Sequence, residues 1–340
     1  MTLNKILAEK VMPKMGLTSK GEPIVPNRGR IAHNLIIPTE ERGEVLFRCC
    51  PAESSKAALG YGIEQAKFEL KTLSFLAQKG TPTPKPIKLS SDDTYAVEEQ
   101  GWLVFAYPIE EGCTLDQSDL DITVAREAGA LLSEIITASE TYIPEGNEPN
   151  GDVDYIKTII GNFLKRRPDM SERSVFREML DQLDNQTFAQ ALERTPKGLV
   201  HGDFFFENVL SRDGHLVGVI DFGDAYQGCL LMDVAIGSME FAMKEGENWD
   251  FDLHEAFLKS NQNWLSKNQV SCELFHGALL ANCARFTAHL CNLAQDKLEE
   301  NKNPNGEIDL SDNQYVGRFY MFRRPEVKTE LQRRYEAAIF

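Results

Sequence analysis

The amino-acid sequence predicts an α+β protein of two lobes, with a small, mainly antiparallel β lobe over residues 1–107 and a larger helical lobe over residues 108–340. Three observations lead to this prediction. The chain has 340 residues, which is more than one hydrophobic core usually serves. Strand-like apolar segments gather in the first third, around one amphipathic helix. From Asp121 onward, apolar residues recur mostly at helical spacing.

Three strands are predicted in the small lobe, at Ile31–Pro38, Gly43–Cys50 and Trp102–Tyr107. Each is rich in apolar residues and is bounded by polar or glycine-containing breaks. Between the second and third strands, Glu64–Gln78 carries its apolar side chains on one helical face, and Gly80 follows as a helix stop. This lobe is therefore expected to be a sheet with a single helix.

The larger lobe is expected to begin with a helix after Asp121, whose apolar side chains form one stripe. Two more helices are predicted at Tyr155–Leu164 and Val175–Leu192. A β-hairpin follows, with its turn at Gly214, and a terminal helix is predicted at Arg324–Ala338. The apolar residues between the hairpin and the terminal helix continue the helical lobe.

The composition limits the classes of protein to which the chain can belong. A formal net charge of -16 argues against a nucleic-acid binder and permits a cationic substrate. No apolar run approaches the roughly 20 residues that cross a bilayer, and the first residues lack the apolar core of a signal peptide. Seven cysteines without a C-x-x-C pair suit reduced thiols. We therefore expect a cytoplasmic protein without a membrane partner.

Two short polar turns interrupt apolar runs near the middle of the chain. The first lies in Leu199–Leu210 and carries Asp203 and Asn208, and the second carries Asp221. Phosphoryl transfer needs a group that aims the attacking hydroxyl, hard oxygen ligands for magnesium and neutralisation of the developing charge. One such side chain alone means little, because Asp and Asn are common in turns. Two motifs in this order, joined by a hairpin turn, are far more specific.

The first motif has the form H-G-D-x-x-x-x-N, with Gly202 where protein kinases have arginine. This segment resembles that of the aminoglycoside phosphotransferase and choline kinase family, whose members phosphorylate small molecules. The resemblance implies a protein-kinase-like fold and ATP with Mg²⁺ as cofactors. The apolar residues of the motif, and an R-F pair at Arg285, are more similar to the homoserine and hydroxylysine kinase branch.

The resemblance assigns roles to the residues of the two motifs. It implies that Asp203 is the catalytic base and that Asn208 and Asp221 hold the magnesium ion. Asp233, at the start of a later helix, matches a carboxylate that braces the catalytic segment in the family. His201 invites a catalytic role, but its place directly after an apolar strand favours structural support of the loop through its ring nitrogens.

The resemblance also indicates nucleotide-binding residues in the small lobe. Arg48 stands where the family usually has a phosphate-contacting lysine, and Glu69 matches the helical glutamate that pairs with it. Lys56 is an alternative if the strand extends further, and Arg48 on a solvent-facing strand position is another. Gly29 and Asn34 are the candidates in the loop that covers the phosphates.

The chain segment that joins the two lobes is the expected place of the adenine ring. Backbone groups near Ala106 and Tyr107 are the candidates for hydrogen bonds to adenine, although an ordinary core strand fits the same residues.

The acceptor is expected to be a small molecule with a hydroxyl group. Glu207 and Asp224 lie beside the metal motif and can attract an ammonium group, or they are solvated turn residues. Arg285 and His289 share a helix face that can bind a carboxylate, or that is simply solvated. The acceptor itself and the oligomeric state stay open, a homodimer being one allowed state.

Two functions outside this class of enzyme also fit the sequence. A pseudokinase would keep the fold as a binding or regulatory module, and Arg48 is the feature that favours it; the intact Asp203, Asn208 and Asp221 argue against it. A protein kinase is disfavoured because no A-P-E-like activation segment follows Asp221.

Overall fold

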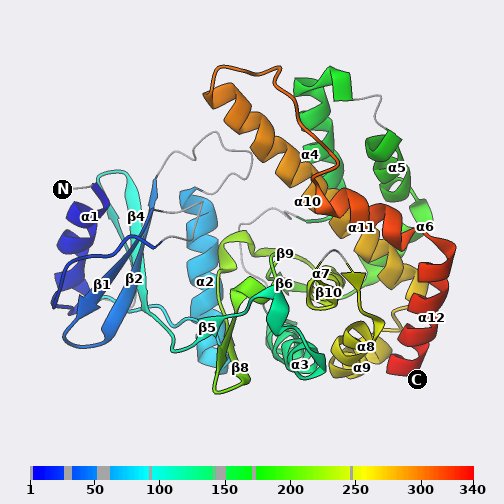
Figure 1. Cartoon of the computed structure of the whole chain (residues 1–340). Helices are drawn as coiled ribbons and strands as arrows, with labels where there is room; N and C mark the ends of the chain where they lie inside the picture. Colours follow the sequence, from blue (N-terminus) through cyan, green and yellow to red (C-terminus); the bar gives the residue numbers. More distant parts are fainter. Residues whose placement is uncertain are drawn as a thin grey trace.

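The structure is a computed structural model that describes residues 3–26, 33–51, 62–91, 94–140, 142, 151–170, 174–245 and 248–340. A β-sheet with two flanking helices lies at one end of the molecule, and a larger assembly of helices lies at the other (Figure 1). The predicted α+β architecture is therefore confirmed.

The sheet of the small lobe has four antiparallel strands in the order β1-β2-β4-β3. They are β1 (His33–Thr39), β2 (Gly43–Pro51), β3 (Ala96–Glu99) and β4 (Trp102–Pro108). The three predicted strands are confirmed as β1, β2 and β4. β3 was not predicted, because its four residues include two glutamates and only one fully apolar pair.

Two helices cover opposite faces of this sheet. α1 (Leu3–Val11) packs on the face that carries Val45, Phe47 and Cys49 of β2, within one apolar cluster. The alternate residues of β2 point to the other face, since successive side chains of a strand alternate. That face is covered by α2 (Ile63–Lys79), which matches the predicted helix and ends at Gly80.

The segment after α1 extends the sheet beyond β1. Ile24 and Ile36 exchange two backbone hydrogen bonds of 2.8 Å each, so residues on both sides of 27–32 are held together in antiparallel fashion. Lys20 N–H likewise donates to the Pro38 carbonyl at 2.8 Å. This pairing protects the otherwise open edge of β1.

The helical lobe is built around the long helix α10 (Cys272–Glu300), which is buried over most of its length. α7 (Leu231–Phe241), α4 (Val153–Arg166) and α11 (Gln314–Phe322) pack against it. Figure 1 shows α10 running diagonally through this lobe. The other helices are α3 (Ile122–Ser139), α5 (Ser174–Leu183), α6 (Gln186–Arg194), α8 (Phe251–Ser260), α9 (Gln262–Lys267) and α12 (Pro325–Ile339).

The single helix predicted over residues 175–192 is wrong, because the structure divides it into α5 and α6. Asn185 lies between them, and its side-chain oxygen accepts hydrogen bonds from the N–H groups of Thr187 and Phe188. An asparagine at this position caps a new helix, since it satisfies donors that the first turn leaves free.

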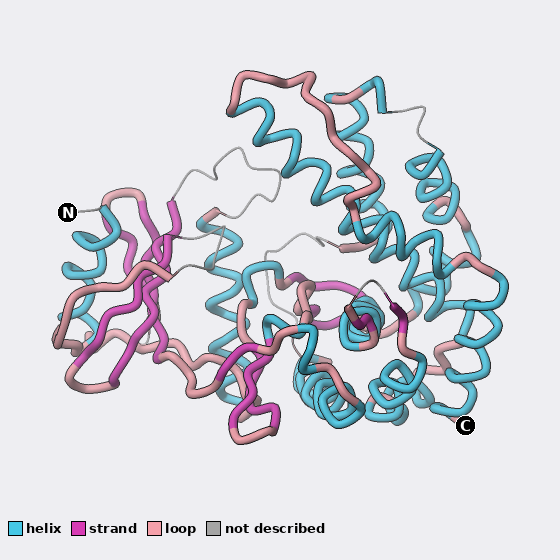
Figure 2. Tube along the Cα trace, viewed as in Figure 1, coloured by secondary structure: helices cyan, strands magenta, loops and turns pink. Residues whose placement is uncertain are grey.

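The larger lobe also contains short strands among its helices (Figure 2). β6 (Lys197–Val200) pairs with β9 (Tyr226–Cys229), and β7 (Val209–Arg212) pairs with β8 (His215–Val219). The predicted hairpin is thus confirmed. Its turn places Asp213 at φ 53° and Gly214 at φ 80°, the left-handed conformations that a two-residue hairpin turn requires. The remaining short elements are β5 (Cys113–Thr114), β10 (Met243–Lys244), β11 (Asn248–Trp249) and the 3-10 turns η1 (Met12–Met15), η2 (Gln117–Asp119), η3 (Pro168–Met170), η4 (Phe206–Asn208) and η5 (Phe222–Asp224).

Within the described residues, no helix combines the length and the apolar character that crossing a membrane requires.

Candidate active site

The loop after β6 makes a tight turn that only glycine allows at position 202. Gly202 has φ +80°, and a Cβ atom built on it would lie 2.5 Å from the backbone oxygen of Asp224. A side chain there would have to displace backbone, which is costly. The glycine of the H-G-D triplet therefore allows the two motif loops to approach each other closely.

His201 connects these loops from the interior. Its side chain is buried; Nε2–H donates to the Ile220 carbonyl at 3.0 Å, and Nδ1 accepts from the Asp203 N–H at 3.2 Å. These two bonds require the neutral ring with its proton on Nε2. Burial lowers the pKa of His201 to about 4, in agreement with that form. Both ring nitrogens are therefore used to hold the loop.

Asp233 supports the same loop from the first turn of α7. Its carboxylate is fully buried and accepts from the backbone N–H groups of His201 at 2.5 Å and of Gly202 at 2.9 Å. Burial raises the pKa of Asp233 to about 6, against the effect of these two donors. The brace that the sequence suggested is present in the geometry.

Asp203 and Asn208 contact each other directly. The Asn208 side-chain amide donates to the Asp203 backbone oxygen at 2.8 Å and to its carboxylate at 2.9 Å. Both N–H bonds of the Asn208 amide are thus directed to Asp203. The amide oxygen of Asn208, Oδ1, is left as a hard ligand atom for a metal ion. Burial, then Asp224 and Asp221, raise the pKa of the Asp203 carboxyl.

Asp221 begins the turn η5 in a left-handed conformation, with φ 62°. Its side chain is half exposed, whereas the next residue, Phe222, is buried and packs its ring 4.4 Å from that of His201. The turn therefore leaves the Asp221 carboxylate accessible, within 3.4 Å of Arg48 of the small lobe, and buries the following aromatic ring.

These groups suit a magnesium ion that is completed by phosphate oxygens. The donor set consists of an amide oxygen, Asn208 Oδ1, and a carboxylate, Asp221, and Mg²⁺ prefers such hard oxygen ligands. The mutual repulsion of Asp203, Asp221 and Asp224 is a further feature that a divalent cation relieves. In the described part of the chain, no three His, Cys, Asp or Glu side chains form a self-contained metal site.

Arg48 joins the small lobe to this turn. It is only 5% exposed, and its Nη1 lies 2.9 Å from Glu69 Oε1 and 3.4 Å from Asp221 Oδ1. Glu69 is fully buried on α2. The alternative of a solvent-facing Arg48 is thus excluded. Arg48 lies opposite Asn34 in the β1–β2 register, so these two side chains share one face of the sheet.

Gln65 is a contact that the sequence analysis missed. Its side-chain amide donates to the carbonyls of Gly223 and Ala225, each at 2.8 Å. Gln65 precedes Glu69 by four residues, so both lie on the same face of α2. That spacing of two polar residues on a buried helix face was the available signal. Through this pair, α2 holds both sides of the turn formed by Asp221 and η5, which we call the metal turn because Asp221 is the expected metal ligand.

The backbone at the lobe junction takes part in the sheet and its neighbouring loop. The Ala106 carbonyl accepts a hydrogen bond from the Ile87 N–H at 2.8 Å, which leaves one lone pair of its oxygen. Tyr107 is paired with Leu46 in the sheet, and its buried side chain lies beside Arg48. Burial raises the pKa of the Tyr107 hydroxyl to about 12. The backbone that follows β4 is a further candidate for hydrogen bonds to adenine at this junction.

Two predicted positions, Gly29 and the alternative Lys56, lie outside the described residues.

The residues proposed for the acceptor side divide into two groups. Glu207 is exposed on η4, and Asp224 is partly exposed, with a pKa that burial raises. Arg285 is only 3% exposed and donates Nη1–H to the Gly202 carbonyl at 2.6 Å. His289 is partly buried, and burial and the charge of Arg285 lower its pKa to about 3. Arg285 and His289 therefore do not form a solvated helix face, which was one of the two alternatives for them.

The sequence matches the phosphotransferase enzyme family over residues 29–266, well over half of the chain. The chain belongs to this family. The matched range contains the residues expected to serve in catalysis and metal binding, whereas α1, α10, α11 and α12 lie outside it.

Homoserine kinases from several bacteria are among the curated proteins to which this chain is similar. The homoserine kinase of Neisseria meningitidis serogroup B is 32% identical over 91 residues, which are 27% of this chain and 30% of the relative. That of Methylobacillus flagellatus is 28% identical over 200 residues, 58% of this chain and 59% of the relative. The chain thus matches less than two thirds of the length of each.

Solved structures share the fold of this chain over almost its whole length. The choline kinase from Cryptosporidium parvum Iowa II superposes with a TM-score of 0.63 at 12% identity, over 98% of this chain and 99% of that one. The GDP complex of aminoglycoside 2'-phosphotransferase-IIIa gives a TM-score of 0.60 at 12% identity, over the same shares. At such identities the similarity establishes the fold.

Proposed function

We propose that this protein is a small-molecule kinase that transfers the γ-phosphate of ATP to a hydroxyl of a small, amine-bearing metabolite. The observation that carries the proposal is the convergence of Asp203, Asn208 and Asp221 on two adjoining turns, facing the buried Arg48–Glu69 pair. Membership of the phosphotransferase enzyme family supports this reading.

The two lobes divide the work in this proposal. Residues 1–107 form the nucleotide-binding lobe, in which Arg48, held by Glu69, contacts ATP phosphates. Asn34 lies on the same face, and its Oδ1 is a buried acceptor. Residues 108–340 form the lobe that binds the acceptor and carries the catalytic loop. The adenine ring lies at the junction after β4.

Asp203 acts on the acceptor hydroxyl. Its carboxylate orients the O–H group and accepts the proton as the oxygen attacks phosphorus. The Asn208 amide keeps one carboxylate oxygen fixed, which leaves the other for the acceptor. Asn208 Oδ1 and Asp221 would hold Mg²⁺, which supplies charge neutralisation at the phosphates when it is bound. His201 and Asp233 keep the loop in this conformation.

The acceptor is expected to carry a positive charge. Asp203, Asp224 and the exposed Glu207 create a negative potential beside the reacting hydroxyl, which favours an ammonium group. The homoserine kinases among the relatives act, by name, on an amino acid that bears both an ammonium group and a hydroxyl. We therefore rank homoserine and similar amino alcohols first.

A cytoplasmic site of action is part of the proposal. ATP is available there, and all seven cysteines are free thiols, as a reducing compartment requires.

The protein-kinase alternative is less favoured because the chain returns to structure immediately after the metal turn. Between η5 and β9 there is only Ala225, and α7 begins at Leu231, so no activation segment fits there. The pseudokinase alternative rests on Arg48, which stands where the family usually has lysine. A measurement of turnover with Mg-ATP and an acceptor decides between a pseudokinase and an active kinase.

The test is release of ADP from Mg-ATP in the presence of homoserine, hydroxylysine, choline, ethanolamine, sugars or aminoglycosides. We expect one amine-bearing acceptor to give strong turnover. Asp203→Asn should lower kcat about 10³-fold or more while Mg-ATP affinity stays within threefold, since it removes the base and keeps the shape. Mg-ATP binding without turnover on any acceptor would favour the pseudokinase instead.

A further inference from the structure

Arg285 is a buried cation that belongs to neither of the two motifs. It lies beside the catalytic loop, which is defined here as residues 199–210. It lies on α10, outside the range that matches the family, and is separated from Gly202 by 83 residues. Its side chain is 3% exposed, and its Nη1–H donates to the Gly202 carbonyl at 2.6 Å. A hydrogen bond from a charged donor in a buried place is among the stronger kinds.

The position of the guanidinium is fixed on two sides by aromatic rings. Its central carbon lies 5.5 Å from the ring centre of Tyr226 and 5.0 Å from that of Phe286. Tyr226 belongs to β9, which directly follows the metal turn, and Phe286 packs against Phe205 of the catalytic loop at 5.2 Å. The rings hold the planar group in a defined orientation, as cation–π contacts do.

Space for this cation exists because residue 202 has no side chain. A Cβ atom on Gly202 would lie only 3.3 Å from Arg285 Nη2. The H-R-D triplet of protein kinases carries an arginine at this position of the chain, whereas here a glycine stands in the triplet and the guanidinium arrives from α10. The positive charge beside the base is therefore supplied by a distant helix.

The carboxylates around the loop experience this charge. Arg285 acts against burial and lowers the pKa of Asp203, Asp224 and Asp233. Asp224 also experiences the charge of Arg48, and Asp233 accepts from two backbone N–H groups, but Arg285 acts on all three carboxyl groups.

We propose that Arg285 is a positioning residue of the phosphotransfer reaction: it fixes the Gly202 carbonyl, and with it the direction in which the Asp203 carboxylate meets the acceptor hydroxyl. The inference rests on the proposed function, since Asp203 is the base only in a kinase. Arg285 does not contact the acceptor in this arrangement. Its effect belongs to kcat, because a small displacement of a catalytic group is costly in rate.

The test compares two buried arginines. Arg285→Lys keeps the charge but loses the planar group between the rings. The matched control is Arg318→Lys, since Arg318 is also 3% exposed, also lies over a ring, that of Tyr315, and pairs with Glu240 of α7 at 2.6 Å. We expect Arg285→Lys to lower kcat about 100-fold, with the acceptor KM and the Mg-ATP Kd within threefold. Arg318→Lys should keep kcat within twofold.

Hydrogen exchange gives a second measurement that needs no acceptor. Amides in residues 199–210 should exchange several-fold faster in Arg285→Lys than in the wild type and in Arg318→Lys. If Arg285→Lys does not fold, Phe286→Leu removes one of the two rings and keeps the charge, and it should lower kcat about tenfold in the same direction.

Three results would overturn the inference: an unchanged kcat with unchanged exchange, an equal loss in both arginine variants, or a loss confined to the acceptor KM. The last would mean that Arg285 binds the acceptor. A wild-type protein that releases no ADP with any acceptor would contradict the proposed function instead, and hydrogen exchange would still decide whether Arg285 holds the loop.

Discussion

The side-chain amide of Gln65 donates to the carbonyls of Gly223 and Ala225 at 2.8 Å each, and so fastens α2 to both sides of the metal turn. Glu69, one helical turn further on, reaches the same turn through Arg48, which lies 3.4 Å from Asp221. Two independent contacts therefore couple the position of α2 to the carboxylate of Asp221. A displacement of this helix must also move the Asp221 carboxylate, which is the proposed metal ligand.

Replacing Gln65 by methionine should loosen this coupling. Methionine has a similar length but donates no hydrogen bond, so two carbonyls lose this donor, at a cost of about 1–3 kcal/mol. We expect Gln65→Met to raise the concentration of Mg²⁺ that gives half-maximal turnover by about tenfold. Gln78→Met is the control, because Gln78 is exposed on the same helix. An unchanged Mg²⁺ requirement would show that α2 does not set the metal turn.

The buried Arg48–Glu69 pair should show strong coupling in a double-mutant cycle. Arg48→Met or Glu69→Gln alone leaves one charge buried without its partner and should cost about 3–5 kcal/mol in the free energy of unfolding. The double variant should cost clearly less than the sum of the two. Urea denaturation measures the three values. Additive costs would mean that the two side chains are stabilised by other groups.

His254 should make the protein less stable in acid. Burial lowers its pKa to about 3, and Ser238 contacts its Nδ1 at 2.6 Å. An unfolded histidine titrates near 6.5, so the unfolded chain binds the proton first. The contribution of the neutral ring is therefore complete above pH 6.5 and falls by about 1.4 kcal/mol per pH unit between pH 6.5 and 3.

Replacing this histidine isolates that contribution from those of the other titrating groups. The free energy of unfolding of His254→Asn, measured by denaturant between pH 7 and 5, should fall less steeply with acidification than that of the wild type. His215→Asn is the control, since the side chain of His215 is 74% exposed. Equal slopes for the wild type and His254→Asn would contradict the predicted protonation.

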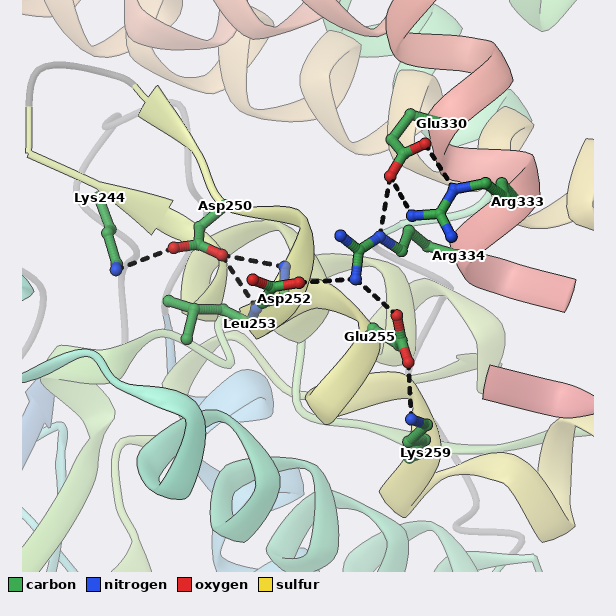
Figure 3. A network of polar contacts seen from close by, with 9 residues as sticks. All are labelled: Lys244, Asp250, Asp252, Leu253, Glu255, Lys259, Glu330, Arg333 and Arg334. Carbon is green, nitrogen blue, oxygen red and sulfur yellow. Dashed lines mark hydrogen bonds and ion pairs between the residues drawn. The ribbon is translucent and has the colours of Figure 1, made fainter. Parts of the chain in front are cut away.

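An ionic network fastens the terminal helix α12 to α8 (Figure 3). Arg334 contacts Asp252 at 2.6 Å, Glu255 at 2.8 Å and Glu330 at 2.9 Å. Its neighbour Arg333 contacts only Glu330 among the residues drawn. Networks of this kind contribute more than single exposed pairs.

Arg334→Met should therefore lower Tm by about 2 °C or more, and Arg333→Met by less than about 1 °C. Calorimetry at low ionic strength and in 1 M salt provides the measurement. Salt should reduce the difference between the two variants, because it screens partly exposed charges. Equal Tm values for the two variants at low ionic strength would count against a role of the network in holding α12.

Much of the local structure follows from the sequence. The strands β1, β2 and β4, the helix α2 and the hairpin β7–β8 were predicted, because each has its own apolar period and its own stop residues. The helix α1 and the strand β3 were missed. Both segments are short, so neither has a strong apolar pattern of its own. Their stability comes from contacts with the rest of the sheet.

The sequence by itself determined that the Asp203 and Asn208 side chains can meet. They are five residues apart, so the local course of the chain is sufficient. The need for glycine at position 202 comes from the close approach of the Asp224 backbone, which is a tertiary contact. Only the tertiary structure decided which distant groups surround the loop. Arg48 lies 173 residues from Asp221 along the chain, and Arg285 lies 83 residues from Gly202. Such contacts depend on how whole helices pack, which no local pattern of residues contains.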